Sequence, residues 1–131
     1  MSSTLNPEIP NKERLYRSIF FDWWNFKRGE VSIAAFLDAR GVSVDRTGDR
    51  IHNDIIENLK LRFRRSRLKA ISSLTAGKCR KLDTFVFYSR SNRNLYHSSI
   101  WNSETEVELT YNKAYNLSKA VRIDFIDDQL I

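Results

Sequence analysis

The 131-residue sequence has few of the residues that mark several classes of protein. Its single cysteine excludes a disulfide scaffold and a zinc site built from several cysteines. With only 2 prolines and 4 glycines, it is not a collagen-like, linker-like or low-complexity chain. No apolar run approaches the roughly 18–20 residues of a membrane span, and the polar N-terminus lacks the apolar core of a signal peptide. We therefore expect a soluble, cytoplasmic protein with no membrane partner.

The composition is otherwise that of a folded protein, with 41% hydrophobic, 12% aromatic and 29% charged residues. A chain of this length suffices for one compact domain and is too short for two. Residues 1–13 contain both prolines and show no hydrophobic periodicity. We expect 1–13 to be a flexible leader and 14–131 to form a single small α+β domain.

Hydrophobic periodicity predicts the main elements of this domain. A helix is predicted over about 50–66, where apolar residues recur every four positions and acids lie early and bases late, as the helix dipole favours. A second helix is predicted over 111–121. Strands are predicted at 14–21, 85–88, 95–101 and 121–126, with short apolar pieces at 31–36 and 42–44 and the edge of a strand at 70–74. The strands at 85–88 and 95–101 are expected to form a hairpin, in a domain of four or five short strands with two or three helices.

The positive charge of the chain is a local feature. Lysine and arginine number 22 against 16 acids, and nine of these bases, with no acid, lie between Lys60 and Lys81. Nucleic-acid binding needs such bases, because neutralising phosphates releases counterions and supplies affinity. The predicted nucleic-acid-binding residues are Lys60, Arg62, Arg64, Arg65, Arg67, Lys69, Lys78, Arg80 and Lys81. Five aromatic side chains would supply stacking faces for single-stranded bases: Trp23, Trp24, Tyr88, Tyr96 and Trp101. The competing interpretation is a solvated helix end, with the aromatic residues in the core.

A catalytic site is a second alternative. His97 would act as general base or nucleophile partner with Asp45, or with the hydroxyls of Ser32 and Ser43, on a nucleotide or nucleic acid. The competing interpretation is that His97 lies in an aromatic strand and bonds a backbone carbonyl. No metal or cofactor is expected, since the histidines and the cysteine lack the short spacings of zinc ligands and there is no glycine-rich phosphate loop.

Charge separation along the chain favours a third class of function, protein interaction. The C-terminal part is acidic, with three glutamates over 104–108 and three aspartates over 124–128. A basic patch and an acidic end favour a polyanionic partner, but they equally favour head-to-tail association of two copies of the chain. The sequence leaves a protein partner or a homo-oligomer open.

Three segments resemble a family of short uncharacterised prokaryotic proteins. The segments are Gly29–Phe36 (G-x-V-S-x-A-A-F), Val42–Arg46 (V-S-V-D-R) and Asn94–Ile100 (N-x-x-H-x-x-I). Ile33 stands where the family usually has a second serine, and Leu95 where it has proline. The family has no established activity, and several such proteins lie beside mobile-element or defence genes. The resemblance implies a fold unit and a surface, but no reaction. From the basic segment we expect a small nucleic-acid-associated binding module that acts as an accessory component of a prokaryotic complex.

Overall fold

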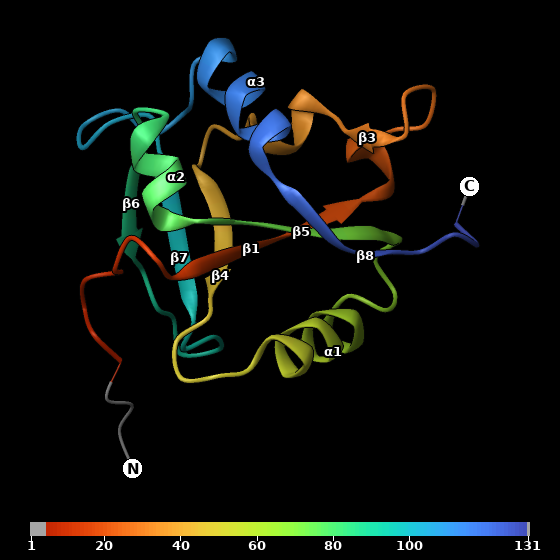
Figure 1. Cartoon of the computed structure of the whole chain (residues 1–131), viewed down its shortest axis with the longest axis horizontal. Helices are drawn as coiled ribbons and strands as arrows, with labels where there is room; N and C mark the ends of the chain where they lie inside the picture. The colour runs from red at the N-terminus through yellow and green to blue at the C-terminus, as the bar shows by residue number, and fades with distance from the viewer. Residues whose placement is uncertain (1–4, 131) are drawn as a thin grey trace.

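The strands of the protein form one six-stranded antiparallel sheet in a computed structural model that describes residues 5–130 (Figure 1). The sheet order is β6-β7-β4-β1-β5-β8. Its strands are β1 (Arg14–Phe20), β4 (Val42–Arg46), β5 (Leu68–Thr75), β6 (Phe85–Tyr88), β7 (His97–Trp101) and β8 (Arg122–Ile126). A second, two-stranded sheet pairs β2 (Trp24–Asn25) with β3 (Glu30–Val31), and the helices are α1 (His52–Arg62), α2 (Ala76–Lys81) and α3 (Tyr111–Ala120). Two 3₁₀ turns lie at Phe21–Trp23 and Ile33–Phe36.

The α+β class expected from the sequence is confirmed, but the expected number of strands is wrong. Within residues 5–130 there are eight strands rather than four or five. The strands β2 and β3 are two residues long, which is too short for an alternating pattern to reveal them. None of the helices within residues 5–130 has the length and apolar character that crossing a membrane requires.

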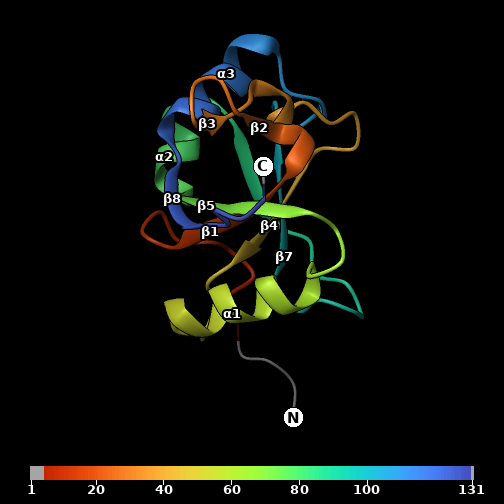
Figure 2. The same cartoon turned by 90° about the vertical axis from the view of Figure 1, so that its right-hand side faces the viewer.

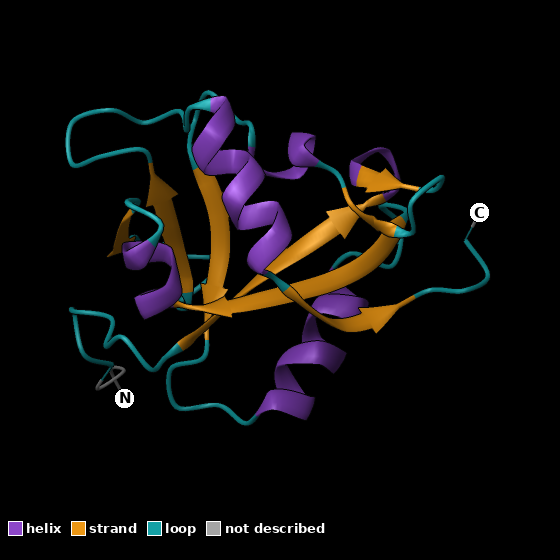
Figure 3. Ribbon diagram, turned by 45° about the horizontal axis from the view of Figure 1, so that its top comes forward, coloured by secondary structure: helices purple, strands orange, loops and turns teal. Residues whose placement is uncertain are grey.

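The helices cover the two faces of the sheet unequally. Figures 1 and 2 show α1 alone on one side and α2 and α3 together on the other, and Figure 3 shows α3 lying across the middle of the sheet. Successive side chains of a strand point to opposite faces, so β1 directs Leu15 and Ile19 to the side of α3 and Tyr16 to the side of α1. Each face therefore has a hydrophobic core of its own.

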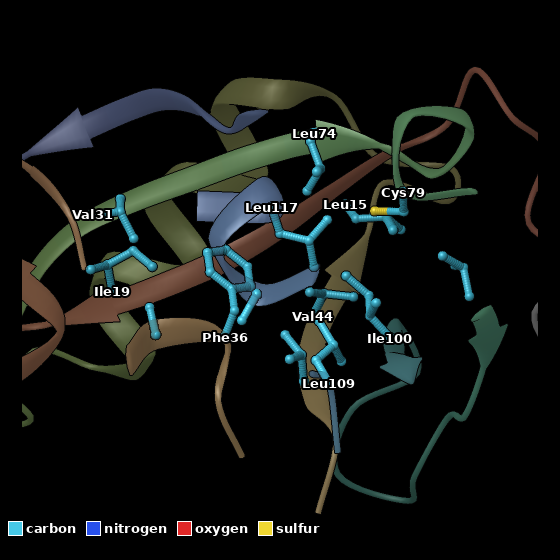
Figure 4. Packing of buried hydrophobic residues seen from close by; sticks show 14 of the residues in the cluster. Leu15, Ile19, Val31, Phe36, Val44, Leu74, Cys79, Ile100, Leu109 and Leu117 are labelled. Atoms are coloured by element: carbon cyan, nitrogen blue, oxygen red, sulfur yellow. The ribbon is translucent and has the colours of Figure 1, made fainter. Parts of the chain in front are cut away.

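The larger core lies on the side of α2 and α3 (Figure 4). Phe36 of the 3₁₀ turn, Leu74 of β5 and Leu117 of α3 meet there, and Cys79 of α2 is buried beside them. The smaller core joins α1 to strands β1 and β5 through Ile55, among others. No residue of β4, β6 or β7 belongs to this smaller core within the described chain, so α1 covers only part of its face of the sheet.

Residues 5–13, part of the expected flexible leader, pack against the domain instead of standing apart from it. Ile9 is buried in the larger core. The backbone N–H groups of Ala76 and Gly77 donate to the carbonyls of Glu13 and Asn11, each at 2.8 Å. An apolar anchor and satisfied backbone groups thus fix a segment whose sequence shows no periodicity. The rest of the expected leader, residues 1–4, lies outside the described residues.

Candidate nucleic-acid interface and the Asp45 pocket

The fold divides the nine bases between 60 and 81 into separate groups. Five lie at the end of α1 and in the loop after it, and we call them the α1 cluster: Lys60, Arg62, Arg64, Arg65 and Arg67. Three exposed bases lie on α2: Lys78, Arg80 and Lys81. The eight residues of β5 separate the two groups by roughly 25 Å, and α1 and α2 cover opposite faces of the sheet. The nine bases therefore do not form one continuous surface.

Lys69, the ninth base, is buried. Its Nζ donates to the backbone carbonyls of Asp127 at 2.7 Å and Leu130 at 2.8 Å. The ammonium also lies 5.4 Å from the ring centroid of Phe26. Carbonyl dipoles and an aromatic face together compensate the loss of water around this charge, so Lys69 fastens the segment after β8 and offers nothing to a ligand.

All members of the α1 cluster except Arg62 line a surface groove of about 410 Å³. Within residues 5–130, no carboxylate forms an ion pair with Arg64 or Arg65, and both side chains are exposed. Arg67 stacks its guanidinium 3.7 Å from the ring centroid of Phe21. Lys60 pairs with Glu57 at 3.4 Å across one turn of α1, an exposed contact of little strength. Arg64 and Arg65 thus bring unpaired positive charge to the groove, although Asp127 also lines it.

Three of the four predicted catalytic residues line one pocket of about 230 Å³. Ser43, Asp45 and His97 lie there with Arg62 of the α1 cluster. Ser32 does not, because its hydroxyl accepts a hydrogen bond from the N–H of Ala34 at 3.2 Å and caps the 3₁₀ turn on the other side of the sheet. The structure therefore brings together His97, Asp45 and Ser43 and excludes Ser32.

The carboxylate of Asp45 joins three elements that border the pocket. Arg62 at the end of α1 donates to both carboxylate oxygens at 3.2 Å, and Asn94 of the β6–β7 loop donates to Oδ1 at 3.0 Å. Arg50 lies 3.5 Å from Oδ2. Since the side chain of Asp45 is only 7% exposed and its oxygens are occupied, it acts as a structural anchor that also aims Arg62.

His97 is engaged by its neighbours on the β6–β7 hairpin. Its Nδ1 lies 3.0 Å from the carbonyl oxygen of Ser89 and 2.9 Å from the Ser89 hydroxyl, which lies 2.7 Å from the hydroxyl of Ser99. Although His97 and Asp45 are paired across β7 and β4, no hydrogen bond joins them within the described chain. The carbonyl contact agrees with the structural interpretation of His97, and no pair of nucleophile and base is formed among the predicted catalytic residues that the structure describes.

The side chains of Arg17 on β1 and Cys79 on α2 are both buried. Arg17 on β1 donates to the carbonyl of Ala35 at 2.8 Å and to that of Ser43 at 2.8 Å, and burial lowers its pKa to about 10, so that the guanidinium stays charged at neutral pH. Burial raises the pKa of the Cys79 thiol to about 12, even though the nearby charge of Arg80 opposes the rise. The basic neighbours of Cys79 therefore do not make it a reactive thiolate.

Comparison of the chain with family models, with curated proteins and with solved structures finds no match. Within residues 5–130, no group of three or more histidine, cysteine or acidic side chains is placed to hold a metal ion. The α1 cluster and the pocket that Asp45 lines are adjacent, because Arg62 belongs to both.

Proposed function

We propose that the protein is a nucleic-acid-binding module that contacts phosphates through the α1 cluster, as an accessory component of a larger complex. The observation that carries this proposal is the pair of exposed arginines, Arg64 and Arg65, which no carboxylate within residues 5–130 neutralises. Guanidinium groups bind phosphate oxygens through two parallel hydrogen bonds. Several of them on one short loop can neutralise neighbouring phosphates of a polynucleotide and so release counterions.

Two members of the cluster are held in place before any ligand binds. Arg62 is oriented by Asp45, and Arg67 by the ring of Phe21. Ordered side chains lose less conformational entropy on binding than free ones, so these two arginines favour binding beyond their charge. Asp127 is a carboxylate on the wall of the groove, and its Oδ1 accepts the N–H of Gln129 at 3.0 Å, which occupies part of its acceptor capacity.

The first test compares charge reversal at the α1 cluster with the same change on α2. Arg64→Glu with Arg65→Glu is expected to weaken binding of a fluorescein-labelled 20-nucleotide strand about tenfold or more at 0.1 M salt, because two phosphate contacts are lost. The matched control, Lys78→Glu with Lys81→Glu, changes the net charge equally on the opposite face and is expected to weaken binding much less. Fluorescence anisotropy across a salt series supplies the affinities and the salt slope.

Three results contradict the proposal. The wild-type protein does not bind the strand, or its binding does not weaken as salt is added, or the two double variants weaken binding equally. In the last case the effect is one of net charge and not of a site at the end of α1.

A second candidate function, self-association, is favoured by one observation at the edge of the sheet. The edge strand β8 exposes Ile123 by 39% and Ile126 by 38%. Edge strands present unpaired backbone groups that pair with another strand. If two copies associate there, light scattering gives a mass that rises toward twice the chain mass with concentration, and Ile123→Lys reduces it. A constant monomeric mass removes this candidate.

A further inference from the structure

One part of the sheet is left open on the face that α1 covers elsewhere. The strand β4 is an inner strand, flanked by β7 and β1, yet its second residue, Ser43, is exposed. The register places Ser99 of β7 opposite Ser43, and Phe87 of β6 opposite Ser99. These three residues form a row across three strands on the face of α1, which packs against β1 and β5 instead. We call this region, with Phe85, His97 and Trp101, the open face.

Aromatic rings occupy the outer half of the open face. The centroids of Phe85 and Phe87 lie 5.5 Å apart, and those of Phe87 and Trp101 lie 4.7 Å apart with the rings nearly perpendicular. None of the three belongs to either buried core within the described residues, and each is only partly buried. The aromatic and β-branched composition of the strand predicted at 85–88 is typical of a buried strand, but of its four residues only Val86 is buried.

A glycine makes room for the indole of Trp101. A Cβ atom on Gly41 would lie 2.7 Å from Nε1 of Trp101, and the φ angle of Gly41 is +91°, which a side chain disfavours. The ring is therefore seated against the backbone just before β4. Rings that are locked in this way present flat apolar surfaces at little entropic cost, which is the property that a stacking platform for bases needs.

Cationic groups border the open face on the side of the α1 cluster. Arg62 lines the same pocket as Ser43 and His97. Arg90 and Arg93 in the β6–β7 loop are exposed, and no carboxylate pairs with either within residues 5–130. The loop lies beside the end of α1 (Figure 2). The border is therefore complementary in charge to a phosphate chain.

Of the acids near the open face, Asp45 and Glu106 are already occupied, whereas the exposed Glu8 lines a surface pocket with Phe85, Phe87 and Arg80. Asp45 is held by Arg62 and Asn94. Glu106, in the loop that follows Trp101, accepts hydrogen bonds from the side chains of Asn102 and Ser103. The exposed arginines of the border thus favour the phosphates of a strand on the side of the α1 cluster, with its bases toward the rings.

We infer that the ligand is single-stranded nucleic acid, with phosphates along the α1 cluster and Arg62 and bases stacked on Phe87 and Trp101 of the open face. This inference rests on the proposed function and names the ligand class of the same site. Strands in a sheet lie about 4.8 Å apart, so the row from Ser43 to Phe87 spans about 10 Å across the open face. A duplex hides the faces of its bases and cannot use the rings, whereas a single strand exposes them.

The decisive experiment measures two ligands, a labelled 20-nucleotide oligothymidine and a 20-base-pair duplex, at one salt concentration. Phe87→Ala is expected to weaken oligothymidine binding about tenfold and to leave duplex binding unchanged, since only stacking is removed. Phe87→Leu keeps the apolar volume without a flat ring and is expected to show the same selective loss, which covers the case in which the alanine variant does not fold. Tyr111→Ala removes an exposed ring from α3, on the other face of the sheet, and serves as the control.

The outcomes separate this inference from the proposed function. The single-strand inference is overturned if every Phe87 variant that folds binds oligothymidine like the wild type. It is also overturned if the wild type binds the duplex as tightly as oligothymidine. In both cases the phosphate-binding function stands. If the wild type binds neither ligand, the proposed function fails and the inference fails with it. Quenching of tryptophan fluorescence by oligothymidine that disappears in Trp101→Phe supports stacking at the open face.

Discussion

Replacing Glu13 by glutamine is expected to lower the free energy of unfolding by about 3–5 kcal/mol, because it leaves a buried arginine without its counterion. Arg46 on β4 is 2% exposed at its side chain, and its Nε and Nη2 donate to the Glu13 carboxylate at 2.7 and 2.8 Å. The N–H of Gly48 donates to the same carboxylate at 2.8 Å. Chemical denaturation measures the loss, and Glu8→Gln, at an exposed position, is the matched control.

The same carboxylate sets part of the acid sensitivity of the fold. Burial acts to raise the pKa of Glu13, but the hydrogen bonds from Arg46 and Gly48 outweigh it, and the pKa lies below its ordinary value of 4.5. A folded-state pKa below the unfolded value gives stability that is present above pH 4.5 and is lost as the pH falls through the lowered pKa. The glutamine variant is expected to lose this part of the pH dependence. A variant as stable as the wild type at pH 7 shows that the pair contributes nothing.

Replacing Asp45 by asparagine is expected to lower the free energy of unfolding by about 2–4 kcal/mol. The amide keeps one acceptor oxygen but loses the charge that Arg62 and Arg50 require. The effect is expected to be smaller than at Glu13, because the side chain of Arg62 is 35% exposed and water screens it when the pair is broken. Asp22→Asn, at an exposed position, is the control.

This variant also separates an anchoring role from a catalytic one. Catalytic groups are commonly held at a cost to stability, so their replacement leaves the fold as stable as before or more stable. A clear loss of stability in Asp45→Asn thus supports the anchoring role that its hydrogen bonds indicate. An unchanged or raised midpoint of thermal unfolding contradicts it and restores the candidate enzyme site with His97.

The elements with an uninterrupted hydrophobic period were predictable from the sequence. The predicted helices at about 50–66 and 111–121 correspond to α1 and α3, and the predicted hairpin to β6 and β7. For β5 the sequence predicted only the edge of a strand, at 70–74. The strand covers Leu68–Thr75, lies inside the sheet and has seven of its eight residues buried. Its polar residues Ser72 and Ser73 interrupt the apolar pattern, and each finds its partner far away in the sequence, in the carbonyl of Arg17 and the carboxylate of Asp124.

The site was less predictable, because the number of bases in a segment does not show on which face of the sheet each base lies. The run from Lys60 to Lys81 is continuous in sequence, but β5 carries its last three bases to the far side of the sheet. The β-branched and aromatic residues at 85–88 indicated a strand, but not that its face with Phe85 and Phe87 stays uncovered. Whether a helix covers that face depends on where α1 packs, which is decided by its contacts with β1 and β5 and not by the residues of β6.

The order of strands in the sheet has a consequence for the rate of folding. Of the neighbouring strands in the six-stranded sheet, only β6 and β7 follow each other in the chain. Every other pairing, such as that of Arg14 with Thr75, closes a long loop before its contacts can compensate the lost chain entropy. Domains dominated by such non-local pairings fold in about milliseconds to seconds. The β6–β7 hairpin, which carries the aromatic rings, closes the shortest loop of any strand pair in this sheet. The β1–β5 pair at the centre forms only after segments that are distant in the sequence have met.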